Sequence, residues 1–293
     1  MTTRARIESL FRPLGWALVA LSAVFLVVVA REHWDAIGAI RLSGGAWAMV
    51  AMLALVYGLS LLLLAIGWHF VLSHARAEPV SLAHSVRAYG MAQLAKYVPG
   101  NVFHLVGRHM IHRNAGMADK ALARAALAEI VLMIGAALAV VALCIAIAPP
   151  AMLGGYGLVA ALLAGLLALG ALIVVLRIGG GAPVHAVLAF ALAFAFFTVM
   201  ALMIAMLVAL LGAPLSFAAA GGGVAAWLAG FVTPGAPGGL GIREAAMVLF
   251  AGGTASAEVL FVAAALFRLV SFGGDLVCFT VASLLPGKMR QTA

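Results

Sequence analysis

The sequence predicts an all-α polytopic membrane protein, and three observations support that class. Of its 293 residues, 66% are hydrophobic and only 9% are charged, whereas a soluble protein carries about 25% charged residues. Apolar runs of about 20 residues, enough to cross roughly 30 Å of hydrocarbon as helix, recur along the chain. A proline-glycine pair, Pro99-Gly100, recurs 135 residues later as Pro234-Gly235. We therefore expect a single integral membrane domain over residues 1–293.

Six apolar runs are predicted to span the membrane as full helices. They cover about residues 14–30, 46–72, 121–148, 154–176, 184–211 and 255–285. The first run resembles a signal peptide and includes a passable cleavage site at Val28-Val29-Ala30. Its length and the five spans behind it favour a retained anchor instead. Cys144 and Cys278 fall inside apolar runs, which favours small buried hydrophobes over a disulfide or a metal site.

Two further segments, residues 81–115 and 216–250, each contain one of the Pro-Gly pairs. Proline ends a helix because it lacks an N–H and clashes with the preceding turn. Glycine then permits the chain to reverse. Each segment is therefore predicted to form a re-entrant hairpin of two half-helices.

The distribution of charge predicts the topology. Residues 73–124 carry seven lysines and arginines against two acidic residues, and both termini are basic. Basic loops stay on the cytoplasmic side, so we expect both termini there, in a multi-pass protein of the bacterial cytoplasmic (inner) membrane. Basic residues set between apolar runs indicate contact with anionic lipid headgroups rather than nucleic acid.

This topology closes only if each broken segment returns to the side it entered. The chain then divides into two halves, about 14–148 and 154–285, each built as span, span, hairpin, span. An odd number of spans in each half turns the second half upside down. We therefore expect an inverted-topology repeat, which in transporters places the binding site at the membrane midplane, between the repeats.

An anion site is predicted where a half-helix begins inside the membrane. Its unpaired N–H groups and the positive end of its dipole suit a phosphate. The candidate substrate-binding residues are Lys96, Asn101, Arg108, Gly235, Gly238, Gly239, Gly241, Arg243 and Glu244. Of these, Arg108 is expected near the cytoplasmic mouth, where it gathers headgroups. In the alternative interpretation the glycines serve close helix packing, and Arg243 and Glu244 face water.

Three more charges stand out because they fall deep inside predicted spans, namely Glu129, Arg268 and Asp275. The repeat offset brings Glu129 close to Arg268, and Arg268 shares a helix face with Asp275, so either pair is an option. A structural lock and a coupling-ion or proton role both stay open. The candidate gating and coupling residues are Pro99, Gly100, Pro234, Glu129, Arg268 and Asp275.

The sequence offers no constellation for catalysis or cofactor binding. His104, His109 and His112 lack a further metal ligand nearby, and we interpret them as facing headgroups. The chain contains no convincing nucleophile–base arrangement and no nucleotide fingerprint. We therefore expect neither an enzyme nor a cofactor or metal protein.

Two motifs resemble those of a known family. AKYVPGN (95–101) is similar to the Lys-Tyr-Ile/Val-Pro-Gly signature of the lysylphosphatidylglycerol synthase transmembrane region, the flippase-like domain family. TPGAPGGLGIRE (233–244) is similar to that family's Pro-Gly-Gly-Leu-Gly-x-x-Glu signature. The resemblance covers nearly the whole chain and implies a lipid translocase. Asn101 stands where a lysine is common, and this stand-alone chain shows no aminoacyltransferase domain, so a lysyl-lipid substrate is not carried over.

The resulting expectation is a lipid flippase that moves an anionic or zwitterionic phospholipid, or a polyprenyl-phosphate-linked lipid, between leaflets by alternating access. The alternative is a non-transporting accessory subunit that presents lipid to a glycosyltransferase or aminoacyltransferase. The membrane lipid is the expected partner in the first case. A homo-oligomer and a lipid-modifying enzyme partner both stay open.

Overall fold

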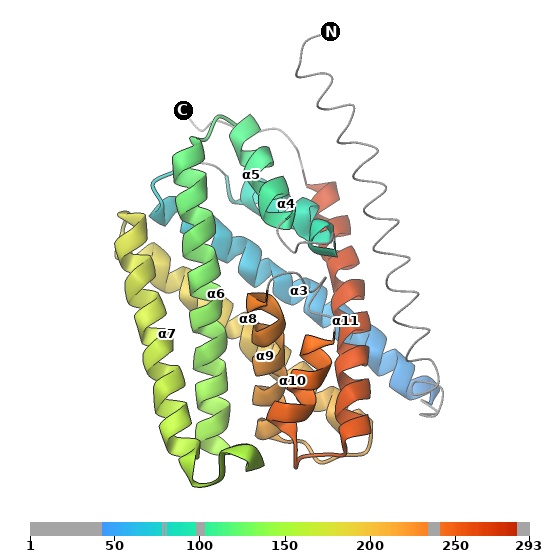
Figure 1. Ribbon diagram of the computed structural model, residues 1–293. Coiled ribbons are helices and arrows are strands. Elements are labelled where there is room, and N and C mark those ends of the chain that lie inside the picture. The colour runs from blue at the N-terminus through green and yellow to red at the C-terminus, as the bar shows by residue number, and fades with distance from the viewer. Residues whose placement is uncertain (1–42, 78, 80, 98–102, 234–240, 286–293) are drawn as a thin grey trace.

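The computed structural model describes residues 43–77, 79, 81–97, 103–233 and 241–285, and these form helices joined by short turns, with no strand among them (Figure 1). The helices are α3 (Gly44–His74), α4 (Leu82–Gln93), η1 (Leu94–Tyr97), α5 (Phe103–Asn114), α6 (Asp119–Ile147), η2 (Ala151–Tyr156), α7 (Gly157–Gly179), α8 (Pro183–Leu210), α9 (Phe217–Val232), α10 (Ile242–Ala251) and α11 (Ala257–Leu284). The predicted all-α class is confirmed over these residues.

Five helices are long and apolar enough to cross a membrane: α3, α6, η2 with α7, α8 and α11. They confirm five of the six predicted spans, and the span at 14–30 lies outside the described residues. Their 28–31 residues correspond to about 42–46 Å of helix. That length exceeds the hydrocarbon thickness, which long helices accommodate by tilting, by kinking or by thickening the bilayer locally. α3 crosses the bundle obliquely in Figure 1. Large side chains such as Leu163 and Leu166 are exposed, as lipid-facing positions are.

The two broken segments begin in the same way. The hydroxyl oxygen of Ser81 accepts a hydrogen bond from the His84 N–H and caps α4. That of Ser216, 135 residues later, accepts from Ala218 and Ala219 and caps α9. These bonds satisfy N–H groups that a helix start leaves free. The helices end at Tyr97 and Val232 and resume at Phe103 and Ile242, and both Pro-Gly pairs lie in the intervening stretches, outside the described residues.

One end of the bundle, the upper end in Figure 1, brings together the end of α3, the α5–α6 turn and the α7–α8 turn, and most of the described lysines and arginines lie in or near these segments. The Gly181 N–H donates to the His74 carbonyl at 2.8 Å and joins the end of α3 to the α7–α8 turn. Arg87 Nε donates to the Leu285 carbonyl at 3.1 Å and joins α4 to the end of α11. We call this the basic end, and it carries Arg76, Arg87, Arg113, Lys120, Arg124 and Arg177.

The two broken segments start from different ends of the bundle. α4 begins at the basic end, whereas α8 runs away from that end and delivers α9 to the opposite one (Figure 1). α3 packs against α8; α11 packs against α3 and α4; α6 packs against α8 and α9. At the centre, the Tyr57 ring makes edge-to-face contacts with Phe196 and Phe267, with centroids 5.8 and 5.9 Å apart.

α3 and α11 cross where two glycines meet. A Cβ on Gly58 would lie 2.8 Å from the Gly274 carbonyl oxygen, and one on Gly274 would lie 2.6 Å from Tyr57 Cδ1. Such backbone contact gives membrane helices their packing energy, because lipid tails compete equally well for larger apolar side chains.

This crossing predicts a test of the packing. Gly274→Ala should destabilise the protein by about 1–3 kcal/mol, because the added methyl group has no space and forces α3 and α11 apart. Thermal unfolding in detergent should show a lower Tm. The matched control is Gly165→Ala on α7, where an added Cβ meets nothing within 4 Å. A Tm for Gly274→Ala equal to that of the control would contradict the crossing.

Candidate functional site

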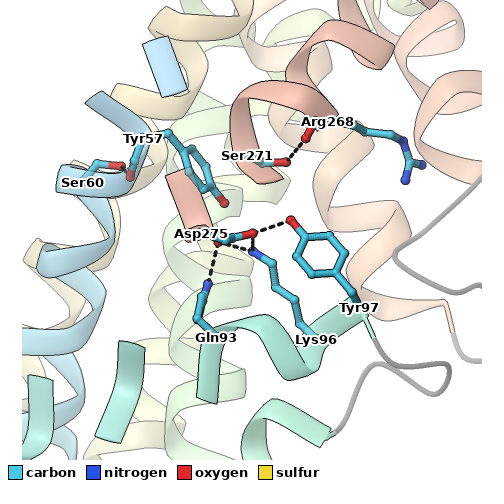
Figure 2. A network of polar contacts seen from close by, with 8 residues as sticks. All are labelled: Tyr57, Ser60, Gln93, Lys96, Tyr97, Arg268, Ser271 and Asp275. Carbon is cyan, nitrogen blue, oxygen red and sulfur yellow. Dashed lines mark hydrogen bonds and ion pairs between the residues drawn. The ribbon is translucent and has the colours of Figure 1, made fainter. Parts of the chain in front are cut away.

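Asp275 is the centre of a polar network between α11 and the first broken segment. Its side chain is fully buried, and its carboxylate accepts from Gln93 Nε2 at 3.2 Å, from the Tyr97 hydroxyl, and from Lys96 Nζ at 2.7–2.8 Å (Figure 2). An isolated carboxylate in this position would be costly, and the three donors offset that cost. The network therefore fixes η1, the last described turn before residues 98–102, onto α11.

Lys96 is held on more than one side. Its ammonium lies 5.8 Å from the Tyr57 ring centroid and 5.5 Å from that of Tyr97, distances at which cation–π attraction operates. The Tyr97 ring in turn contacts Phe272, with centroids 5.3 Å apart. Lys96 is thus neutralised by Asp275 here, and its role in substrate binding stays a prediction.

Arg108 and Glu129 form a second buried cluster. Arg108 Nη1 donates to Glu129 Oε1 at 2.8 Å, and Nη2 pairs with Oε2, a two-pronged arrangement that fits guanidinium to carboxylate. The Arg108 guanidinium lies 3.8 Å from the Trp68 ring centroid and 4.7 Å from that of Tyr89. The pair ties α5 to α6.

This pairing corrects two expectations. Arg108 is only 3% exposed, so it does not project from the mouth of the hairpin to gather headgroups. Glu129 is paired with Arg108 rather than with Arg268. The prediction used only the sequence offset between the two halves, which places Glu129 near Arg268. In the structure α5 packs against α6, and Arg108 therefore pairs with the Glu129 carboxylate.

Glu244 and Arg268 form a third cluster, which ties α10 to α11. Arg268 Nε donates to Glu244 Oε1 at 2.5 Å and Nη2 donates to Oε2 at 3.1 Å. Glu244 lies in the first turn of α10, as predicted, and is 4% exposed. The other predicted option, an ion pair between Arg268 and Asp275, is wrong. Arg268 pairs with Glu244, and its side chain points away from Asp275 in Figure 2.

Arg243 lies next to this third cluster, in a small pocket between α9, α10 and α11. The pocket leaves about 20 Å³ for the centre of a water molecule and is lined by Trp227, Met247, Phe267 and Arg268 among others. That volume is enough for about one water. The Arg243 guanidinium carbon is 5.9 Å from the Trp227 ring centroid. Its stem crosses α9 at Gly230, where a Cβ would lie 2.6 Å from Arg243 Cγ.

Charge in the described interior is unbalanced at Arg243. The three buried carboxylates, those of Glu129, Glu244 and Asp275, are each paired with a different cation. Within the described ranges Arg243 forms no ion pair, and its buried Nε has no hydrogen-bond partner. The Arg243 side chain as a whole is partly buried, and a positive charge there without a carboxylate attracts an anion, because protein and lipid screen it less than water does. The unpaired charge therefore favours a nearby anion, while the pocket itself has room for about one water.

Several predicted site residues fall outside the described part of the chain, namely Pro99, Gly100, Asn101, Pro234, Gly235, Gly238 and Gly239. Gly241 is described: it precedes α10 with φ of 72°, a left-handed conformation that favours glycine. His109 pairs with Asp119 at the surface, and His112 accepts from Trp68 Nε1 at 2.9 Å. The described residues contain no group of three or more histidine, cysteine or acidic side chains able to hold a metal.

Some residues of the site were missed by sequence reasoning. Tyr97 and Gln93 both donate hydrogen bonds to Asp275. Tyr97 belongs to the motif at 95–101, so its hydroxyl could have been recognised as a candidate polar group of the site. Trp68 and Trp227 carried no signal, because an aromatic residue inside an apolar helix has no distinguishing pattern.

The Arg108–Glu129 pair predicts a strong dependence of stability on both partners. Arg108→Met should destabilise the protein by about 3–5 kcal/mol, because it leaves the Glu129 carboxylate buried and unpaired. The double variant Arg108→Met with Glu129→Leu should recover most of that loss. Tm in detergent is the measurement.

The matched control is Arg113→Met, since Arg113 pairs with Asp119 at the surface, where both are more than half exposed. An exposed pair contributes about 0–1 kcal/mol. Equal Tm losses for Arg108→Met and Arg113→Met, or a double variant less stable than the single one, would show that the buried pair is not formed.

Comparisons with protein-family models, with curated proteins and with solved structures find no match for the chain. The family resemblance therefore rests on the two motifs at 95–101 and 233–244. Of these, the described residues include Lys96 and Tyr97 from the first, and Gly241, Arg243 and Glu244 from the second. Each of the three named charges lies at one of the clusters above.

Proposed function

We propose that the protein is a lipid translocase that moves an anionic or zwitterionic phospholipid, or a polyprenyl-phosphate-linked lipid, between leaflets. The single observation that carries the proposal is Arg243, which lines a pocket between membrane helices and has no carboxylate partner in the described chain. An ionisable group at such a position is costly, and it commonly marks a substrate pathway. The abundant anions in a bilayer are lipid phosphates.

The start of α10 adds to the attraction for a phosphate. Arg243 and Glu244 lie in its first turn, where N–H groups lack helical partners and the dipole favours negative charge. Gly241, just before the helix, has no side chain to cover them. Because the Glu244 carboxylate is paired with Arg268, it does not neutralise Arg243. The planar guanidinium of Arg243 can therefore donate hydrogen bonds to a phosphate diester.

We further propose that α3–α6 and α8–α11 are inverted repeats, with α4–α5 and α9–α10 as re-entrant hairpins. Exchanging α3 with α8, α4 with α9, α5 with α10 and α6 with α11 relates several observed helix contacts to one another: α11 on α3 and α4 corresponds to α6 on α8 and α9. The serine caps of α4 and α9 and the ion pairs α5–α6 and α10–α11 follow the same exchange.

In this arrangement the Asp275 network differs from the other two clusters, because it connects the two proposed repeats. The pairs Arg108–Glu129 and Glu244–Arg268 each join two helices of one repeat, so they move with that repeat. The bonds from Gln93, Lys96 and Tyr97 to Asp275 instead join the first hairpin to the second repeat. Alternating access rocks one repeat against the other. That motion either breaks these bonds or moves the first hairpin together with the second repeat. Lys96 and Asp275 are therefore the proposed gate.

Orientation follows from charge. Lysine and arginine concentrate on the cytoplasmic side of bacterial membrane proteins, so the basic end is the proposed cytoplasmic end, with both termini there. The second hairpin and Arg243 are then reached from outside. The flippase-like family resemblance agrees with this function, and the residues of its second motif include Arg243 and Glu244.

The orientation is tested by accessibility of single cysteines in a Cys144→Ala, Cys278→Ala background. Cysteines at Ser43 and Ala151, at the end opposite the basic end, should react with an impermeant thiol reagent added outside intact cells. A cysteine at Ala182, in the α7–α8 turn, should react only after the membrane is opened. External labelling of Ala182 in intact cells would reverse the orientation.

The function is tested by leaflet-resolved lipid movement in liposomes that hold the purified protein. Fluorescent phosphatidylglycerol should exchange between leaflets, and Arg243→Ala should slow the exchange by about tenfold or more, the effect of losing 1.4 kcal/mol of binding. Arg243→Lys should restore only part of the rate, since lysine keeps the charge but not the fork.

The control is Arg113→Ala, which removes an arginine exposed at the basic end and should leave the rate unchanged. Lipid binding without leaflet exchange in the wild-type protein would favour the accessory subunit that presents lipid to a partner enzyme. Exchange that is equally fast in wild-type protein and in Arg243→Ala would remove Arg243 from the pathway.

A further inference from the structure

A second cavity lies at the end of the bundle opposite the basic end. It is bounded by the last turns of α6, by η2, by the start of α7 and by α9 and α10, is partly open to its surroundings, and has a volume of about 110 Å³. Its walls include Cys144, Leu153, Ala218, Gly222 and Phe250, and every lining residue is apolar. It does not include Arg243 or any other residue of the three charge clusters.

Helix contacts hold the cavity open. α6 and α9 touch beside it, because a Cβ on Gly221 would lie 2.6 Å from Cys144 Cβ. α9 and α10 touch at Gly222, where a Cβ would lie 2.8 Å from the Ala251 nitrogen. The helices therefore cannot approach further, and the small side chains that permit these contacts leave the space between them unfilled.

We propose that this cavity binds the terminal part of a hydrocarbon chain of a membrane lipid. Water is a poor occupant, because a buried water needs two to four polar partners and these walls offer none. An apolar cavity of about 150 Å³ binds benzene in a soluble protein, so this one has the size for a few methylene groups. An empty apolar cavity loses dispersion contacts along its walls, which an inserted chain restores.

The surroundings allow a chain to enter directly from the bilayer. Leu143 and Ile147 on α6 and Met152 in η2 are at least half exposed beside the cavity, and such apolar positions in spanning helices face lipid. A chain that lies along these side chains therefore reaches the cavity without crossing a polar surface.

The chain site is separate from the proposed headgroup pocket. Ala218, Gly221, Gly222 and Ala225 line the cavity, whereas Gly223, Ala226 and Trp227 line the pocket of Arg243. At 3.6 residues per turn these two sets occupy different faces of α9. Binding of a chain here consequently requires neither Arg243 nor lipid translocation.

The test uses phosphatidylcholine that carries a diazirine at the end of one acyl chain, with the purified protein in nanodiscs. After illumination, adducts should concentrate on peptides that contain Cys144, Leu153 or Phe250, and exceed those on the exposed face of α7. Ala225→Phe, which fills the cavity, should reduce the cavity adducts severalfold. Leu162→Phe, at an exposed position on α7, is the matched control and should not reduce them.

A second variant keeps the test decisive if Ala225→Phe does not fold. Ala160→Leu fills the cavity from the α7 wall and should reduce the same adducts. Uniform labelling of all lipid-exposed helices, or cavity adducts unchanged in a folded filled variant, would overturn the proposal. Because the probe lipid has no net charge and no transport is measured, this result does not depend on the proposed translocation.

Discussion

Neutralising charge inside the membrane is the constraint on which the rest of this structure depends. Among the described residues, the three buried carboxylates are each matched by a cation from another helix, since leaving either partner unpaired would cost several kcal/mol. These ion pairs also connect the helices. Arg108–Glu129 links α5 to α6, and Glu244–Arg268 links α10 to α11. Lys96–Asp275 links η1 to α11. These ion pairs hold short helices, such as α5 with 12 residues and α10 with 10, that could not span a bilayer by themselves.

Away from the basic end, Arg243 is the described cation without a carboxylate partner, and it gives the site its proposed chemistry. The start of α10 brings it to a pocket beside Trp227 and Arg268, and its counter-charge is not supplied by the described chain. A ligand that supplies negative charge there completes the balance. The apolar cavity on another face of α9 is complementary: it lacks polar groups and suits a hydrocarbon chain. One short helix thus separates two sites whose chemistries match the two ends of a lipid.

Much of the fold followed from the sequence because its signals are local. A run of about 20 apolar residues fixes a span, and the predicted 46–72 corresponds to α3 at Gly44–His74. The predicted breaks within 81–115 and 216–250 are local too, since the described helices end at Tyr97 and Val232 and resume at Phe103 and Ile242. The ion pairs were mispredicted for Glu129 and Arg268 because partner choice depends on how helices pack. The cavity had no signal, since a void is a property of packing rather than of any residue.

The most direct test of the central claim is whether Arg243 touches a lipid phosphate. Solid-state NMR dipolar recoupling between guanidinium ¹⁵N and lipid ³¹P, in phosphatidylglycerol bilayers with ¹⁵N-arginine protein, measures such contact. We predict a dephasing component in the wild-type protein that disappears in Arg243→Lys, while the contribution of arginines at the basic end is retained. Identical dephasing in both proteins would contradict the claim that a lipid phosphate balances this charge.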